Sequence, residues 1–340
     1  MKEKRLVWWI KIPFILSIVI FTVVAVVGIA IGYLRLSVSD YYSASERAFR
    51  IPEIHSGFVP QGLDYDQSNQ KFIVSGYMKD KSPSPVYIVD KTSGQTEKRV
   101  TFTKPDGSDY KGHAGGVEIY QNYLYIPEQA SILVFSYQDV LKANDGDKIA
   151  CIDKFSTAVS DDDYIGVSCL TINGDRLIVA EYFRESNSPT LPSHKITTSA
   201  GDYNQALAIE FMLDDSFPLG INPTPVKAFS LPDQVQGVLF DQNKIYLSTS
   251  WGLAFSHILE YDATNLTKEQ DITVLGQILP LYSLDSASLV KDYKIAPMSE
   301  EIVVVDGYLY VMCESASTKY IFGNFTGAEW CYKTNLTKMK

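Results

Sequence analysis

The chain has 340 residues, a formal net charge of −10 at pH 7 and 46% hydrophobic residues. This composition excludes a disordered or low-complexity chain, and the negative charge disfavours nucleic acid, whose phosphates it repels. An acidic domain accommodates cations and cationic ligands or surfaces more readily.

The first predicted element is a transmembrane helix over residues 12–34. This stretch contains no charged residue, and about 20 apolar residues are enough to cross the hydrocarbon core. Trp8 and Trp9 on one side and Tyr33 on the other are typical of interfacial aromatic belts. A cleaved signal peptide with the context Gly28-Ile29-Ala30 is the alternative, but the apolar run exceeds the usual length of about 7–15 residues.

The orientation of this helix follows from its flanking charges. Five of the six charged residues within residues 1–35 are basic, which gives that segment +4 and leaves −14 for the rest. Basic flanks stay inside the cell. We therefore expect residues 1–11 to be a cytoplasmic tail and the C-terminal domain to be extracellular, in a single-pass protein of the cell membrane.

The next segment, residues 35–56, is polar and contains several aromatic residues. We interpret it as a stalk that lifts the domain of residues 57–340 off the bilayer. Within it, residues 43–49 favour a short helix with Ser43 or Ser45 as its cap.

The domain that follows contains five copies of one hairpin pattern: a small residue, alternating apolar residues, a polar turn and a second apolar run. The copies are 61–76, 115–128, 168–181, 236–250 and 300–314. Further strands follow in most copies, such as 85–102 and 256–263, and 318–324 with 328–336 in the last. Successive copies start 53–68 residues apart, longer than a WD blade but suited to blades with long outer loops.

These repeats predict an all-β fold, a β-propeller preceded by one transmembrane helix. Five blades are favoured, and a sixth within residues 265–298 is the alternative. A β-sandwich is the competing all-β architecture, but regular four-stranded repeats are typical of a closed ring.

In a propeller the first strand of each blade lines the central channel, so the residues around its start meet at one mouth. The candidate ligand-binding residues are Gln61, Asp64, His113, Glu118, Ser168, Gln236 and Glu300. His113 and Glu300 have the chemistry for general acid–base work. Glu118 and Glu300, joined by Asp64 and His113, suit a divalent cation such as Ca²⁺. The alternative is that these groups are simply solvated at a wet mouth.

Three other features of the sequence bear on the site. Asp64-x-Asp66-x-Ser68 resembles the start of a calcium loop but lacks its later Gly and Glu, so we predict a hairpin turn. The loop 184–203, which includes His194, is long enough to reach the mouth. Four cysteines in a translocated domain permit two disulfides, or else buried free thiols, and the candidate pairs are Cys313 with Cys331 and Cys151 with Cys169.

The phrases Pro60-Gln61-Gly62-Leu63, Gly115-Gly116-Val117 and Gln236-Gly237-Val238, each followed by strand, turn and strand, resemble a broad propeller superfamily. It includes the gluconolactonase-like, strictosidine-synthase-like and NHL-repeat proteins. In the gluconolactonase-like enzymes, Glu, Asn and Asp hold a divalent metal in the channel. The resemblance implies that Glu300 or Glu118 stands for that Glu, but no matching Asn and Asp are evident.

Two functions remain open at this point. The first is a non-catalytic module that binds a surface protein, glycan or small ligand through the channel mouth or rim loops. The second is a metal-dependent hydrolase of the lactonase or esterase type. The sequence contains no nucleophile elbow, Walker motif, dinucleotide motif or paired histidine ligands, which favours the binding module.

Overall fold

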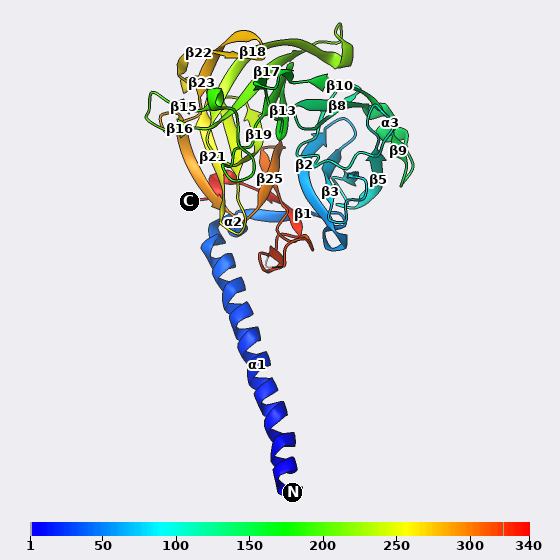
Figure 1. Cartoon of the computed structure of the whole chain (residues 1–340), viewed down its shortest axis with the longest axis vertical. Coiled ribbons are helices and arrows are strands. Elements are labelled where there is room, and N and C mark those ends of the chain that lie inside the picture. The colour runs from blue at the N-terminus through cyan, green and yellow to red at the C-terminus, as the bar shows by residue number, and fades with distance from the viewer. Residues whose placement is uncertain (1, 322) are drawn as a thin grey trace.

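The computed structural model of the chain describes residues 2–321 and 323–340. Helix α1 (Lys2–Ser37) and helix α2 (Ser39–Ser43) come first, and five β-sheets then form a ring (Figure 1). The candidate span Ile12–Ser37 has a mean hydropathy of 3.0, and none of its most apolar window is buried against the ring. α1 is therefore long and apolar enough to span a membrane, and it is not a core helix. The side chains of residues 1–11, including the basic cluster and Trp8–Trp9, lie outside the described part.

Each of the five sheets is one blade whose innermost strand begins one sequence repeat. Blade 1 consists of β2 (Phe58–Asp66), β3 (Lys71–Met78), β4 (Pro85–Asp90), β5 (Thr96–Phe102) and β9 (Lys148–Ile149). Blade 2 consists of β6 (Glu118–Tyr120), β7 (Tyr123–Pro127), β8 (Ser131–Ser136) and β10 (Cys151–Ser156). Helix α3 (Tyr137–Lys142) follows β8.

The remaining blades follow the same order from the axis outward. Blade 3 consists of β13 (Cys169–Asn173), β14 (Arg176–Ala180), β17 (Ala206–Leu213) and β18 (Ile221–Leu231), extended by β23 (Gln277–Ser283) and β22 (Lys268–Val274). Blade 4 consists of β19 (Val235–Asp241), β20 (Lys244–Thr249), β21 (Ser256–Asp262) and β24 (Leu289–Ile295). Blade 5 consists of β25 (Ser299–Val305), β26 (Tyr308–Cys313), β27 (Trp330–Thr334) and β1 (Ser45–Arg50).

Short elements occupy the connections between these strands. Two small hairpins pair β11 (Ala158–Ser160) with β12 (Asp163–Tyr164) and β15 (Ile196–Thr197) with β16 (Tyr203–Asn204). The 3-10 turns are η1 (Ile54–Ser56), η2 (Pro192–His194), η3 (Pro218–Gly220), η4 (Ala263–Asn265), η5 (Gly323–Phe325) and η6 (Leu336–Lys338).

The ring confirms an all-β propeller with five blades. Residues 265–298, where a sixth blade was the alternative, serve two existing blades instead. β22 and β23 widen blade 3 because β23 pairs in parallel with β18, with Ala228 opposite Leu281. β24 is the outermost strand of blade 4, paired antiparallel with β21.

The expected stalk differs from the structure at its C-terminal half. Residues 45–50 form β1, which pairs antiparallel with β27 and places Phe49 opposite Cys331. Helix α2 ends at Ser43, so the predicted helix over residues 43–49 does not form. The physical reason is the unpaired edge of β27, since an N-terminal strand that covers it satisfies the backbone groups on both strands. The strand nearest the N-terminus thus closes the ring.

We use the name mouth end for the end of the ring at which the innermost strands begin. The second strand of each blade finishes there, as the pairing of Phe58 in β2 with Met78 in β3 shows. The connections β3–β4, β7–β8, β14–β17, β20–β21 and β26–β27 therefore lie at the mouth end. The tight β-hairpins within the repeats lie at the opposite end.

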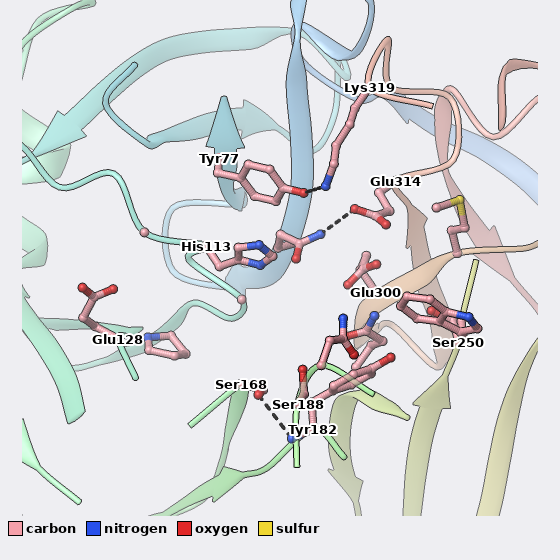
Figure 2. A pocket seen from close by; sticks show the side chains of 18 of the residues that line it. Tyr77, His113, Glu128, Ser168, Tyr182, Ser188, Ser250, Glu300, Glu314 and Lys319 are labelled. Carbon is pink, nitrogen blue, oxygen red and sulfur yellow. Dashed lines mark hydrogen bonds between the residues drawn. The ribbon is translucent and has the colours of Figure 1, made fainter. Parts of the chain in front are cut away.

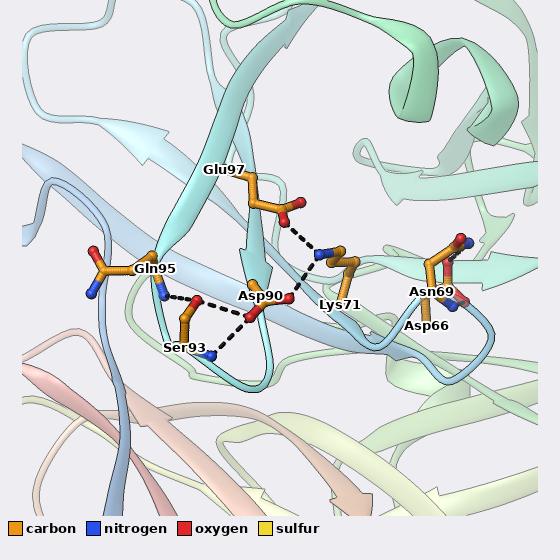
Figure 3. A network of polar contacts seen from close by, with 7 residues as sticks. All are labelled: Asp66, Asn69, Lys71, Asp90, Ser93, Gln95 and Glu97. Atoms are coloured by element: carbon orange, nitrogen blue, oxygen red, sulfur yellow. Dashed lines mark hydrogen bonds and ion pairs between the residues drawn. The ribbon is translucent and has the colours of Figure 1, made fainter.

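One such hairpin turn confirms the interpretation of the calcium-like motif. Asp66 accepts backbone hydrogen bonds from Ser68 and Asn69 at 2.9 and 3.1 Å. Figure 3 draws Asp66 beside Asn69. Nearby, Lys71 Nζ lies 2.8 Å from Asp90 Oδ2, and this partner is the main cause that holds the pKa of Asp90 well below its ordinary value. The aspartates here serve the turn.

The innermost strands approach one another so closely at the axis that glycine is required. A Cβ on Gly62 would lie 2.6 Å from the carbonyl carbon of Gly116, and one on Gly116 would lie 3.1 Å from Leu170 N. Glu301 fills the space between them: its Oε2 accepts the N–H of Leu63 at 2.8 Å and of Val117 at 3.1 Å. One buried carboxyl thereby joins blade 5 to blades 1 and 2.

The candidate disulfides are not formed and the free-thiol alternative holds, because all four cysteines are free. Cys313 packs with Val311 in one inter-blade core, whereas Cys331 packs with Met312 in the core on the other face of the same sheet. Side chains that point to opposite faces cannot bridge. Cys151 and Cys169 likewise belong to different inter-blade cores.

This arrangement predicts how many thiols react with a labelling reagent before and after denaturation. In the folded full-length chain, only the half-buried Cys151 should react with a maleimide reagent, and slowly, because burial raises the pKa of its thiol. All four thiols should react after denaturation without reductant. Mass spectrometry of the labelled protein gives both counts, and two unreactive thiols in the denatured sample would instead indicate a disulfide.

Candidate functional site

A cavity of about 1240 Å³ opens at the mouth end, and all five blades contribute to its wall (Figure 2). Its lining comes from two sources: the starts of innermost strands and the mouth-end loops. Glu300 represents the first source. Lys319 and Tyr320, in the β26–β27 loop, represent the second.

Five of the seven predicted site residues line this cavity: Gln61, His113, Ser168, Gln236 and Glu300. Their convergence follows from the repeat, which places each of them near the start of an innermost strand. Ser168 is already engaged, because its hydroxyl accepts the backbone N–H of Tyr182 at 3.2 Å. Whether these residues bind a ligand stays a prediction.

Asp64 and Glu118 lie elsewhere, farther along the innermost strands. Asp64 Oδ2 accepts the N–H of Ile119 at 2.8 Å, which joins blades 1 and 2 inside the channel. Burial raises the pKa of Asp64 to about 6. Burial and then the carboxyls of Asp64 and Glu301 raise the pKa of Glu118 well above its ordinary value. These two acids belong to the channel interior.

The cavity contains two buried carboxyls, Glu300 and Glu314. Gln61 Nε2 donates a hydrogen bond to Glu314 Oε2 at 3.0 Å. Burial raises the pKa of Glu314 to about 7. Glu300 is 2% exposed, and its Oε1 has no hydrogen-bond partner among the described residues. Burial and then the neighbouring Glu314 raise the pKa of Glu300, against the opposing effect of Lys319. Burial and the neighbouring carboxyl thus favour the protonated form of Glu300.

An aromatic wall faces these carboxyls. The rings of Tyr77 and His113 stack with centroids 4.3 Å apart, and Lys319 Nζ contacts the Tyr77 hydroxyl while lying 4.9 Å from the centre of the Tyr320 ring. Burial and then the Lys319 ammonium lower the pKa of His113, which keeps its imidazole neutral near pH 7. Within the described residues, no ion pair joins Lys319 to Glu300 or Glu314.

The other two carboxylates of the wall, Glu128 and Asp109, are paired within the protein. Lys104 Nζ lies 2.6 Å from Glu128 Oε1, and Lys148 Nζ lies 2.5 Å from Asp109 Oδ1. In the long loop 184–203, Asn187 and Ser188 line the cavity. His194 of the same loop is buried, with Nδ1 at 2.9 Å from Glu181 Oε2. Among the residues that the structure describes, Glu300 is thus the cavity carboxyl with a buried oxygen that has no protein partner.

Sequence reasoning missed Glu314, Tyr77, Tyr182, Lys319 and Tyr320. A signal for some of them was present, because second strands finish at the mouth end just as innermost strands start there. The last residues of three repeats are Glu128, Glu181 and Glu314. Lys319 and Tyr320 lie in a segment predicted as a strand, residues 318–324, which is a mouth-end loop in the structure.

The donor set does not fit the predicted cation site. Among residues 2–321 and 323–340, no three His, Cys, Asp or Glu side chains are grouped as a metal would require. Glu118 interacts with Asp64 and Glu301, whereas Glu300 interacts with Glu314, so the two predicted ligands face different surroundings. A bound divalent cation stays a prediction, which elemental analysis of the purified chain tests.

The closed ring of five blades places the chain in the broad class of β-propellers. The chain matches no family model and no curated protein sequence. Similar solved structures include Myxococcus xanthus glutaminyl cyclase, with a TM-score of 0.41 and 10% identity over 85% of this chain and 93% of that one. BamB from Moraxella catarrhalis has a TM-score of 0.33 and 8% identity, over 76% of this chain and 82% of that one. A nidogen/laminin complex has a TM-score of 0.39 and 8% identity, over 76% of this chain and 73% of that one. These values carry no inference about ligand or activity.

Proposed function

We propose that this protein is a membrane-anchored propeller that binds a small, amine-bearing ligand in its mouth-end cavity. Residues 1–11 lie in the cytoplasm, α1 crosses the membrane, and the propeller is outside the cell. The exposed apolar surface of α1 and its basic N-terminal flank support the anchor. The observation that carries the binding function is the buried, unpartnered oxygen of Glu300.

The chemistry of the ligand follows from this oxygen and its surroundings. A buried polar atom without a partner costs free energy, which a hydrogen-bond donor from a ligand recovers. The aromatic side chains of Tyr77, Tyr182, Trp251 and Tyr320 also line the cavity, and aromatic faces attract cations. An ammonium group satisfies both requirements. Its charge favours the ionised form of Glu300, so binding near neutral pH should release a proton.

The test uses the full-length chain in detergent and two simple probes, 1,5-diaminopentane and its bis-trimethylammonium analogue. Calorimetric titration in buffers of different ionisation enthalpy should show that the primary diamine binds with proton release. The analogue cannot donate hydrogen bonds and should bind more weakly. Glu300→Gln should weaken diamine binding at least tenfold, which corresponds to about 1.4 kcal/mol.

The matched control is Glu46→Gln, which removes the same charge from an exposed position on β1. It should leave diamine affinity unchanged. Equal losses in the two variants would indicate a non-specific charge effect, and the absence of diamine binding by the unaltered chain would refute the amine proposal.

A further inference from the structure

Exposed apolar side chains gather on the rim of the cavity. Trp251 is 42% exposed and Leu253 is 47% exposed, both in the β20–β21 loop, and Ile321 in the β26–β27 loop is 77% exposed. All three also line the cavity. Single exposed apolar side chains are ordinary on a protein surface. A group of large ones around an opening instead indicates a surface that contacts a membrane, a ligand or another protein.

The same two loops hold the end of the apolar helix. The rings of Tyr33 in α1 and Phe255 in the β20–β21 loop have centroids 6.1 Å apart. Gly327 in the β26–β27 loop packs so closely on the Arg35 guanidinium that a Cβ there would overlap it. In Figure 1, α1 leaves the propeller beside α2, and the red segment between β26 and β27 projects on the same side.

The position of the rim relative to α1 identifies its partner. Tyr33 and Leu36, 64% and 76% exposed, mark where the apolar helix ends, and Val38 is already buried in the propeller. Almost no chain separates the two, so the loops that contact Tyr33 and Arg35 lie at the membrane surface. We propose that the mouth end faces the membrane that carries α1, with Trp251, Leu253 and Ile321 in the interfacial layer of the adjacent leaflet.

The chemistry of the rim suits a lipid surface. Tryptophan prefers the interface, where its apolar ring is covered and its N–H stays hydrated. Basic groups accompany the rim aromatics: the Arg184 guanidinium lies 3.3 Å from the centre of the Trp251 ring, and Lys294 Nζ lies 3.9 Å from that of Phe255. Such cations attract lipid phosphates. A ligand then reaches Glu300 along the bilayer surface.

This inference rests on one part of the proposed function, that α1 spans a membrane. The test places spin labels on the full-length chain in lipid nanodiscs. Leu253→Cys and Ile321→Cys report on the rim, and Asn243→Cys reports on the exposed β19–β20 turn at the opposite end of blade 4. Cys151→Ser removes the one half-buried thiol.

Labels at 253 and 321 should collide more with oxygen, which concentrates in lipid, than with a water-soluble nickel chelate. The label at 243 should show the reverse preference. If all three labels show the same aqueous preference while the chain remains in the lipid fraction, the mouth does not face the membrane. Loss of the chain from the lipid fraction would overturn both this inference and the proposed anchor.

Discussion

Replacing Glu301 with alanine is expected to destabilise the propeller by about 4 kcal/mol, because it leaves the buried N–H groups of Leu63 and Val117 without an acceptor. Each unsatisfied buried donor costs about 1–3 kcal/mol, and the lost side chain leaves a void at the axis. Urea unfolding of the full-length chain in detergent, followed by circular dichroism, measures this loss.

Two variants separate the hydrogen bonds from the charge. Glu301→Gln keeps a side-chain oxygen acceptor and should cost much less than the alanine variant. Glu300→Gln alters the adjacent residue on the same strand and should cost less still, because no backbone N–H of the described residues donates to Glu300. An alanine variant within about 1 kcal/mol of the unaltered chain would show that Glu301 does not hold the blades together.

Raising the pH from about 4.5 to 8 is expected to weaken the propeller through Glu314. The pKa of Glu314 rises from 4.5 to about 7 on burial, so the folded chain binds more protons than the unfolded chain between these values. The free energy of unfolding therefore falls as the pH rises through that window, by on the order of 3 kcal/mol. Asp64, whose pKa rises to about 6, adds a loss in the same direction.

The variant Glu314→Gln isolates this contribution, because glutamine remains neutral at every pH. Denaturation midpoints of both chains at pH 4.5, 6 and 8 provide the comparison. The two chains should be similar at pH 4.5, and the variant should become progressively the more stable one at pH 6 and 8. Parallel pH profiles would mean that Glu314 titrates near its ordinary value.

The repeat made the ring predictable because each hairpin is local in the sequence. All five predicted hairpins are the two inner strands of a blade, from β2–β3 to β25–β26. The pairing of β1 with β27 and of β23 with β18 has no local signal. In each case a distant unpaired edge, rather than the propensity of the segment itself, decides the structure.

The residues of the candidate site likewise divide into those that the repeat predicts and those that it does not. Gln61, Ser168, Gln236 and Glu300 were predictable because the repeat fixes where an innermost strand starts, and that start lies at the mouth end. Lys319 and Tyr320 belong to a loop outside the repeat, where no periodicity indicates which way a side chain points. Asp64 and Glu118 fit the pattern but lie beyond the cavity. The pattern could not exclude them because it does not indicate how far the cavity extends along the innermost strands.

The pairing of β1 with β27 also sets the order of assembly. β1 is synthesised before any other strand of the ring, yet its partner is the last strand to be made. While the intervening strands are being made, the backbone groups of β1 therefore lack their partner strand. A chain interrupted before residue 330 has four complete blades and no means of closure, so it exposes strand edges that invite aggregation. This closure thus makes the integrity of the ring depend on strands from both ends of the domain.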